Sequence, residues 1–314
     1  MNCRSPFQDY RAPAFYMITM TAFERRPLFA RCANNRSTLN EEGWLTYNLW
    51  HAMPQSYPEL ATSTLVIMPD HLHGIVRVKE RMAQSVGVPL RAFKSKVTSA
   101  LRKKFGNPDL HVWEPDYHDL CVWRRGALKA YTQYLRDNPR RRCLKKANPD
   151  LFSRINNLRH AKLPKNERWT GYGNLFLLDR PEIDVLQVSR RIADSELDAL
   201  RRRVRKRVDE GAVLVSPFIS PGEKAVARAA LDAGGAVILI KPDGFGPHFK
   251  PHGRYFDLCV EGRLLILACR PPVEFSAKLT RRQCLDMNNW AAAIAKQALM
   301  APAVSGTRRE KAAV

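Results

Sequence analysis

The spacing of apolar residues changes near residue 175, and this change constrains the fold of the 314-residue chain more than any other feature. In the first half, short strand-like segments alternate with helical ones, and the segment His71–Val78 has a roughly alternating apolar pattern. In the second half, the strand-like segments are continuous apolar runs between helices, which is typical of a parallel, doubly wound sheet. The sequence therefore predicts two domains of different classes.

The first half predicts a strand, a helix, two strands, a helix, a strand and a closing helix. β-branched and aromatic residues mark the strands, and apolar residues at helical spacing mark the helices. The Asn138-Pro139 pair is expected to end the last helix, because proline disfavours helical geometry in the residue before it. This order matches a ferredoxin-like α+β fold, an antiparallel sheet with helices. The expected segments are Phe15–Phe23, Asn40–Ala52, Ser63–Met68, His71–Val78, Pro89–Phe105, Asp119–Trp123 and Gly126–Asn138.

The second half predicts an α/β Rossmann-like domain. A polar, irregular stretch at residues 153–174 is expected to be a linker, with an ordered surface segment as the alternative. The expected domains are therefore residues 1–152 and residues 175–314. Beyond the linker, the expected strands are Leu175–Leu178, Val213–Val215, Ala236–Ile240 and Leu264–Ala268, and the expected helices are Ile183–Arg207 and Pro221–Ala233.

Positive charge dominates the composition, with 52 Lys and Arg residues against 30 Asp and Glu residues and a net charge of +22. A field of this sign attracts polyanions, so nucleic acid is the expected partner. No apolar run of about 18 residues, signal peptide or lipidation motif is found, so we expect a cytoplasmic protein with no membrane partner. Seven cysteines without a C-x-x-C pair argue against a disulfide framework or a cysteine zinc site.

Two histidines flank one leucine in the sequence Met68-Pro69-Asp70-His71-Leu72-His73. Side chains alternate along a strand, so His71 and His73 point to the same face and could bind one cation together. The alternative is a strand with two surface or hydrogen-bonded histidines, and the H-x-H pattern alone favours that alternative.

A second pattern lies at the end of the closing helix. Tyr134 and Asn138 are four residues apart and share one helix face, with Tyr131 one turn earlier. Tyrosines in a helix stripe are more often core or interface residues, and Asn138 alone is a simple helix stop. Neither pattern by itself establishes a function.

Five stretches together resemble the HUH single-tyrosine transposases, and among them the REP-associated tyrosine transposases. Their order and spacing agree from the start of the chain to about Lys146. The conjunction of M-P-x-H-x-H with a later Y-x-x-x-N-P is the most specific part of this likeness. The stretches are FYMITMTAFERRPLF, MPDHLHGIV, FKSKVTSALRKK, VWEPDYHDL and YLRDNPRR.

The resemblance implies a metal-dependent enzyme that nicks and rejoins single-stranded DNA. It assigns His71, His73 and Asn138 as ligands of Mg²⁺ or Mn²⁺, and Tyr134 as the nucleophile. Attack would produce a 5′-phosphotyrosine and a free 3′-hydroxyl, and the reverse reaction would join another 3′ end.

Several neighbouring residues receive secondary roles from the same resemblance. Asp70, where many relatives carry Asn, and Asp119 are expected to support the site. Tyr117 and Tyr131 are rivals of Tyr134 for the role of nucleophile. Relatives often recognise hairpins with an adjacent single strand through paired subunits, so we expect hairpin DNA as the substrate and a homodimer.

Basic side chains are the candidates for contacts with backbone phosphates, although a run of charges is often only a solvated face. Trp113, Tyr117 and Trp123 are candidates for stacking on bases. The DNA-binding candidates are Arg91, Lys94, Lys96, Arg102, Lys103, Lys104, Arg140, Arg141 and Arg142.

In the second half, Val213–Glu223 predicts a strand that leads into a helix start, where backbone NH groups can receive a phosphate. This segment is weakly similar to the Rossmann-like domain of the DNA-processing protein family that loads single-stranded DNA. No G-x-G-x-x-G or Walker motif accompanies it, so no nucleotide cofactor is expected, and a turn that packs a helix on its sheet is the alternative. The candidates are Ser216, Ser220, Gly222, Glu223, Gly244, Gly246 and Lys250.

Two other functions fit parts of these observations. A DNA-binding regulator or domesticated transposase would bind repeats without cutting them. An RNA-binding protein would suit the charge but would leave the histidines, Tyr134 and Asn138 without a joint purpose.

Overall fold

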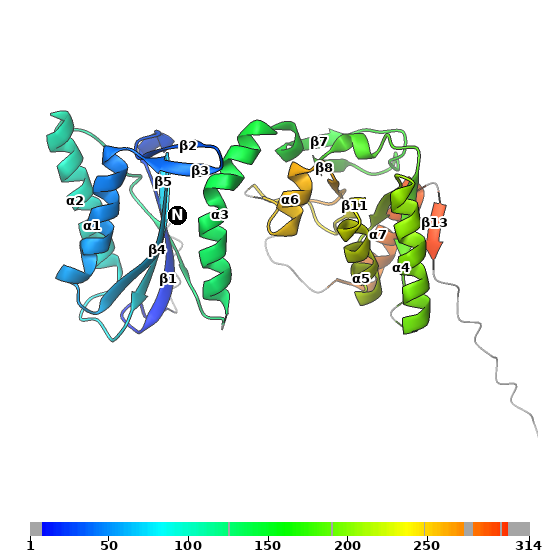
Figure 1. Ribbon diagram of the computed structural model, residues 1–314, viewed down its shortest axis with the longest axis horizontal. Coiled ribbons are helices and arrows are strands. Elements are labelled where there is room, and N and C mark those ends of the chain that lie inside the picture. Colours follow the sequence, from blue (N-terminus) through cyan, green and yellow to red (C-terminus); the bar gives the residue numbers. More distant parts are fainter. Residues whose placement is uncertain are drawn as a thin grey trace, which may run out of the picture. The chain divides into compact units, whose positions relative to one another are not determined.

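The structure of the protein is a computed structural model that describes residues 8–124, 126–189, 191–247, 249–272, 279–295 and 297–300. The chain forms two compact units, Met1–Ala147 and Asn148–Val314 (Figure 1). Two units of mixed α/β structure agree with the expected two domains. The first unit ends at residue 147 rather than at 152, because its last helix marks the boundary. Among the described residues, no helix is long and apolar enough to cross a membrane.

A four-stranded antiparallel sheet forms the centre of the first unit. Its strands lie in the order β4 (Leu60–Met68), β5 (His71–Val78), β1 (Ala14–Thr21) and β6 (His118–Cys121). Each neighbouring pair is antiparallel. The predicted order of strand, helix, two strands, helix and strand is therefore present in the unit.

Two helices, α1 (Glu41–Ser56) and α2 (Gly87–Phe105), cover one face of this sheet (Figure 1). Alternate residues of the strands point into the core beneath them, for example Ile18 and Leu72. The Asn40 side chain accepts a hydrogen bond from the backbone NH of Gly43 and so caps α1, as the sequence around Asn40 predicts.

A third helix, α3 (Ala127–Ala147), covers the opposite face of the sheet (Figure 1). It does not end at Asn138 as expected but continues through Pro139. A proline inside a helix removes one backbone hydrogen bond, and contacts of the second half of α3 with the unit compensate for this loss. Those contacts include the ion pair between Arg142 and Asp70.

A hairpin of β2 (Ala30–Ala33) and β3 (Arg36–Leu39) precedes α1. Its second strand, β3, contacts α1, and both of its strands contact α3. Its two turn residues, Asn34 and Asn35, both have positive φ angles, of 48° and 61°. Asparagine tolerates this left-handed conformation well, so Asn-Asn was the local signal for a hairpin that sequence analysis missed. A short 3-10 helix, η1 (Phe23–Arg25), links β1 to this region.

A substitution at Gly74 would test how tightly the sheet packs against α1. A Cβ added at Gly74 would lie 2.2 Å from a ring carbon of Trp50, a side chain that is fully buried. We expect Gly74→Ala to destabilise the protein by about 1–3 kcal/mol, because the core must shift to admit the methyl group. Thermal denaturation should show a midpoint lower by about 2–4 °C for each kcal/mol. Gly246→Ala is the control, since nothing lies within 4 Å of its added Cβ, and an equal loss there would contradict the packing argument.

The second unit is built on a seven-stranded sheet in the order β13-β9-β10-β11-β12-β8-β7. The strands from β13 to β12 are parallel to their neighbours, whereas β8 and β7 are antiparallel additions at one edge. Their bounds are β7 (Arg154–Leu158), β8 (Trp169–Gly173), β9 (Ile183–Gln187), β10 (Val213–Ser216), β11 (Ala236–Ile240), β12 (Leu264–Ala268) and β13 (Gln297–Met300).

Helices of the second unit connect its parallel strands. Two of them, α4 and α5, pack side by side, and α7 contacts β9, β10 and β11. The Ser220 side chain caps α5 through the backbone NH of Glu223. The bounds are α4 (Asp194–Asp209), α5 (Pro221–Asp232), α6 (Arg254–Val260) and α7 (Arg281–Ile294), with the short 3-10 helices η2 (Asp150–Phe152) and η3 (Leu175–Leu177).

Three expectations for this unit need correction. Residues 153–174, expected to be a linker, contain β7 and β8, two strands of the sheet. The expected strand Leu175–Leu178 is the 3-10 helix η3. The expected helix Ile183–Arg207 is a strand, β9, followed by α4. The sequence did not predict β9 as a strand because it contains and adjoins acidic residues. Their positive partners lie on α4, far away in the sequence.

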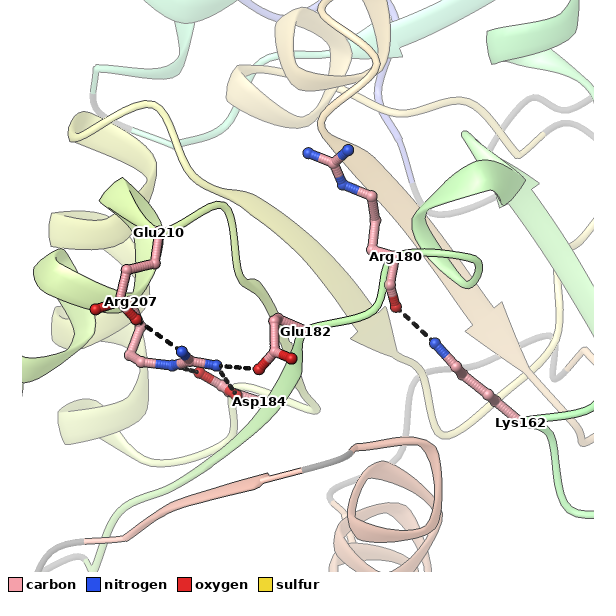
Figure 2. A network of polar contacts seen from close by, with 6 residues as sticks. All are labelled: Lys162, Arg180, Glu182, Asp184, Arg207 and Glu210. Carbon is pink, nitrogen blue, oxygen red and sulfur yellow. Dashed lines mark hydrogen bonds and ion pairs between the residues drawn. The ribbon is translucent and has the colours of Figure 1, made fainter.

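Those acidic residues form an ion-pair network with Arg207 of α4 (Figure 2). Asp184 is fully buried and accepts hydrogen bonds of 2.7 and 3.0 Å from the guanidinium of Arg207. Glu182 and Glu210 bind the same guanidinium, at 2.8 and 2.7 Å. Hydrogen bonds to Asp184, Glu182 and Glu210 raise the pKa of Arg207 further above its already high value. The network therefore joins α4 to β9, the strand next to the edge strand β13.

Candidate metal centre and nucleophile

His71 and His73 lie on the face of β5 that α3 covers. Leu72, between them, points into the core beneath α1 and α2. The two imidazole rings have centroids 4.8 Å apart and are inclined at 78°. Both side chains belong to residues of intermediate burial, so they lie close together at a site that is partly open.

One ring nitrogen of each histidine has a partner within the sheet. His71 Nδ1 lies 2.9 Å from Asp70 Oδ1, and His73 Nδ1 lies 2.7 Å from the hydroxyl of Thr19 on β1. Such bonds orient an imidazole and determine which nitrogen faces a ligand. Nε2 is therefore the atom that either ring would offer to a cation. Thr19 was not predicted, because its place opposite His73 depends on the pairing of β1 with β5.

Asp70 is 7% exposed and is held between cations and His71. Arg142 of α3 donates a hydrogen bond of 2.6 Å to it, and Arg25 lies 3.7 Å away. Burial raises the pKa of this carboxyl, but the hydrogen bond and charge of His71 and the charge of Arg142 outweigh burial and lower the pKa to about 2. Asp70 is thus a carboxylate that supports His71 and also anchors α3.

The ion pair with Asp70 holds Arg142 of α3 at the turn that precedes the histidines. From Asp70, at the turn between β4 and β5, His71 is about 3 Å and His73 about 10 Å along the strand. Counted back along α3 from Arg142, Asn138 is about 6 Å and Tyr134 about 12 Å along the axis. α3 also contacts β4 and β5, so this end of the helix is held against the sheet face that carries the histidine pair.

The Nδ2 atom of Asn138 is buried and has no hydrogen-bond partner among the described residues. A buried polar atom without a hydrogen bond costs free energy, and a ligand that bound to this amide would remove that cost. The two ends of an asparagine amide are assigned from their hydrogen bonds, so its oxygen could equally occupy this position. An amide oxygen and two imidazoles make a chemically suitable set for a divalent cation.

Tyr134 is 40% exposed, which leaves its side chain accessible to a large substrate. The guanidinium carbon of Arg141 lies 5.6 Å from the centre of its ring. Of the rival tyrosines, Tyr117 packs against the core of the first unit. Tyr131 is partly buried and lies one turn before Leu135, which is fully buried. Tyr134 is therefore the most exposed of the three.

Asp119 and its neighbour His118 occupy opposite faces of β6. Asp119 is paired with Ile18, whose side chain is in the core, so the register places Asp119 on the face away from His71 and His73. His118 is paired with Thr19 and shares the face of His73, although sequence analysis gave it no role. Only the register of β6 against β1 distinguishes these two residues.

The basic candidates divide between two layers of the first unit. Those of α2 lie across the sheet from the histidine pair, and three of them already have partners within the unit. Lys94 donates to the carbonyl oxygens of Glu114 and Pro115, Arg102 donates to that of Leu110, and Lys104 forms ion pairs with Glu41 and Glu42. Burial lowers the pKa of Lys94. The side chains of Arg91, Lys96 and Lys103 are exposed.

The basic run of α3 lies on the same layer as the histidine pair. Arg140 donates to Asp137, Arg141 lies beside Tyr134, and Arg142 binds Asp70. Among the aromatic candidates for stacking, Trp123 is 74% exposed whereas Trp113 is only 7% exposed. Trp123 is therefore the accessible one of these two tryptophans.

At the candidate phosphate site of the second unit, backbone NH groups donate to side chains of the chain itself. The Glu223 carboxylate is buried and accepts from the backbone NH groups of Val188, Ile219 and Ser220. Ser216 Oγ accepts from the NH of Phe218. These bonds favour the alternative interpretation, a turn that packs α5 on its sheet.

Within the described part of the chain, no group of three or more His, Cys, Asp or Glu side chains is placed to hold a metal ion. A metal site at the two histidines would therefore need a third ligand of another residue type, such as a side-chain amide.

No family model matches the chain. A relative from Haemophilus influenzae (strain ATCC 51907 / DSM 11121 / KW20 / Rd), described as an uncharacterized protein, is 27% identical over 158 residues, and the match covers 44% of this chain and 87% of the relative.

Solved structures with similarity include a REP-associated tyrosine transposase bound to a REP hairpin, at 16% identity and a TM-score of 0.33, over 43% of this chain and 73% of that chain. DNA processing protein A from Helicobacter pylori matches at 19% identity and a TM-score of 0.36, over 48% and 69%. The Streptococcus pneumoniae protein of that name matches at 20% identity and a TM-score of 0.37, over 57% and 62%. Each of these structural matches covers about half of the chain.

Proposed function

We propose that this protein nicks and rejoins single-stranded DNA, with Tyr134 as the nucleophile and His71, His73 and Asn138 as ligands of Mg²⁺ or Mn²⁺. One observation supports this function above the others. The strand β5 directs two adjacent histidines to the sheet face that α3 covers, and α3 carries both Tyr134 and Asn138, whose buried Nδ2 has no partner among the described residues. A non-cleaving DNA-binding protein needs none of these features together.

The residues of the site suit a cation on chemical grounds. Asp70 and Thr19 hold the imidazoles through Nδ1, and the Nδ2 of Asn138 lacks a partner among the described residues. When bound, Mg²⁺ or Mn²⁺ would polarise the scissile phosphate and reduce its repulsion of a nucleophile. The contribution of the chain is to orient both rings and to keep a negative charge, on Asp70, next to His71.

The reaction at Tyr134 is a transesterification. Its phenolic oxygen forms a bond to phosphorus, the bond from phosphorus to the 3′ oxygen breaks, and that oxygen takes up a proton to become a free hydroxyl. The phenolic proton leaves to water or a nearby base. In the reverse direction, a 3′-hydroxyl attacks the phosphotyrosine and restores Tyr134. Arg141 lies beside the tyrosine ring and forms an ion pair of 4.0 Å with Asp137, and it would bind a phosphate oxygen in exchange for that carboxylate.

The architecture is compatible with this function. We assign the first unit to the ferredoxin-like class, on its strand order and its two helices on one face, and the second unit to the Rossmann-like class, on its parallel strands. The net charge of +22 suits a DNA partner. A hairpin with a single-stranded extension as substrate, and a homodimer as the active form, are further parts of the proposal.

The histidine pair supplies the test. Labelled hairpin DNA with a single-stranded extension is incubated with the protein and Mg²⁺ or Mn²⁺, and a denaturation-resistant protein-DNA adduct is expected. His71→Ala or His73→Ala should reduce adduct formation at least about 100-fold, the scale of losing a positioned group in catalysis. A chelator should abolish the adduct. His51→Ala is the control, because His51 lies on α1, across the sheet, and should retain activity.

Two results would count against the proposal. An adduct that forms equally with the chelator would remove the metal from the mechanism. Tight binding of the hairpin without any adduct, under all metal conditions, would indicate a DNA-binding protein that does not cleave.

A further inference from the structure

Helix α4 of the second unit carries six cationic residues between positions 201 and 207. Two of them are neutralised by carboxylates. Arg201 pairs with Asp198 at 2.8 Å, and Arg207 belongs to the network that holds Asp184 (Figure 2). The other four are exposed and, within the described residues, form no ion pair: Arg202, Arg203, Arg205 and Lys206.

These four side chains point away from the second unit, because the opposite side of α4 is buried in the core of that unit. Leu200, Val204 and Val208 are 4%, 1% and 9% exposed and belong to the core of the second unit. Arg207 joins the helix to β9 from the same unit. Because α4 is held by both contacts, its four unpaired cations form a stable outward surface, which we call the α4 basic face.

The neighbouring helix extends this charge. Helix α5 packs against α4 and exposes Lys224 and Arg228, which are one turn apart and also lack ion pairs within the described chain. The acidic residue of the first turn of α5, Glu223, is buried and bonded to backbone NH groups. The carboxylate of Glu223 therefore does not offset the exposed cations.

The density of charge on the α4 basic face matches that of a nucleic acid. From Arg202 to Lys206 the helix rises about 6 Å. A double helix carries a negative charge for about every 1.7 Å of its axis, so roughly three to four phosphates lie within that length. Four cations are thus displayed over a length that holds a comparable number of phosphates.

We infer that the α4 basic face binds the phosphodiester backbone of nucleic acid, without regard to sequence. An anionic membrane is the other surface with such a charge, but a helix that lies on a membrane needs an exposed apolar side. The leucine and valine side chains of α4 belong to the core of the unit or pack against it, so that side is absent. This contact requires no chemistry at Tyr134 and gives the second unit a role of its own.

The experiment measures the salt dependence of binding by the full-length protein to fluorescent oligothymidylate, a single strand that forms no hairpin. The test variant combines Arg202→Gln, Arg203→Gln, Arg205→Gln and Lys206→Gln. Phosphates of one strand are about 3.4 Å apart, so about two of them lie along the roughly 6 Å of the α4 basic face, and each lost contact makes the slope of log affinity against log salt shallower by about 0.7. Loss of two contacts changes the slope by about 1.4, so the affinity ratio of wild type to variant should fall about 7-fold between 50 and 200 mM salt.

The control variant removes four exposed cations elsewhere in the unit, by Lys165→Gln, Arg168→Gln, Arg281→Gln and Arg282→Gln. It has the same net charge as the test variant and should retain nearly the wild-type slope. A second variant, with Arg202, Arg203 and Arg205 replaced by lysine, keeps the charge and should also bind normally. Circular dichroism verifies that each variant is folded.

An unchanged slope in the test variant would overturn the inference, as would an equal change in the control variant. Binding to phosphatidylserine vesicles that depends on the α4 residues, without their effect on oligothymidylate, would overturn it in favour of a membrane. Because no cleavage is measured, a missing Tyr134 adduct would leave the inference standing, and a normal adduct would not rescue it.

Discussion

Tyr134→Phe should abolish the covalent adduct between the protein and hairpin DNA while leaving the affinity for that DNA within about threefold of wild type. Removal of the phenolic oxygen removes the only atom of this side chain that can bond to phosphorus, whereas the ring and its contact with Arg141 remain. The loss should be complete within detection, since removal of a nucleophile typically costs a factor of about 10⁴ or more. Adduct formation is measured on a denaturing gel, and affinity by fluorescence anisotropy.

Tyr131→Phe and Tyr117→Phe are the matched controls for this result. Tyr117 packs against the core, and Tyr131 lies one turn before the buried Leu135. Both variants should therefore form the adduct at rates within a few-fold of wild type. If one of them lost the adduct and Tyr134→Phe kept it, the nucleophile would be reassigned to that tyrosine.

Arg207→Met should destabilise the second unit by about 3–5 kcal/mol, because it leaves a buried carboxylate without a partner. Asp184 is fully buried, and Glu182 and Glu210 lie around the same guanidinium (Figure 2). Without Arg207, three carboxylates would face one another at the junction of β9 and α4. Amide hydrogen exchange in β9 and β10 measures the loss and should become at least about 100-fold faster.

Arg201→Met is the comparison for this variant. Its partner Asp198 is 55% exposed, and an exposed pair contributes at most about 1 kcal/mol. The double variant Asp184→Asn with Arg207→Met should recover part of the lost stability, because the buried group is then neutral. Equal destabilisation by Arg201→Met would contradict the importance of burial at Asp184.

Much of the first unit was predictable because its signals are local. The Pro69-Asp70 turn and the alternation along His71–Val78 predicted the strand and the shared face of the two histidines, as alternation depends on neighbouring residues only. The helical spacing of Leu90, Phe93 and Val97 likewise predicted α2.

Other elements were mispredicted because their stability comes from distant partners. β9 contains a buried aspartate, which is unusual for an interior strand until Arg207, 23 residues later, is placed beside it. The strands β7 and β8 are polar or glycine-rich, so the sequence did not predict them. They are recognised as strands only from their pairing at the edge of the sheet. α3 continues past Pro139 because the contacts of Arg142 lie on another element.

The sequence by itself determined the order of most elements, the basic character of the chain and the residue types of the candidate site. These properties follow from composition and from spacings of two to four residues. Only the tertiary structure decided that Arg142 anchors α3 at Asp70, that Thr19 orients His73, and that Asp119 faces away from the histidines. The physical reason is that register and helix placement minimise the free energy of the whole unit, through pairs of residues that the sequence holds far apart.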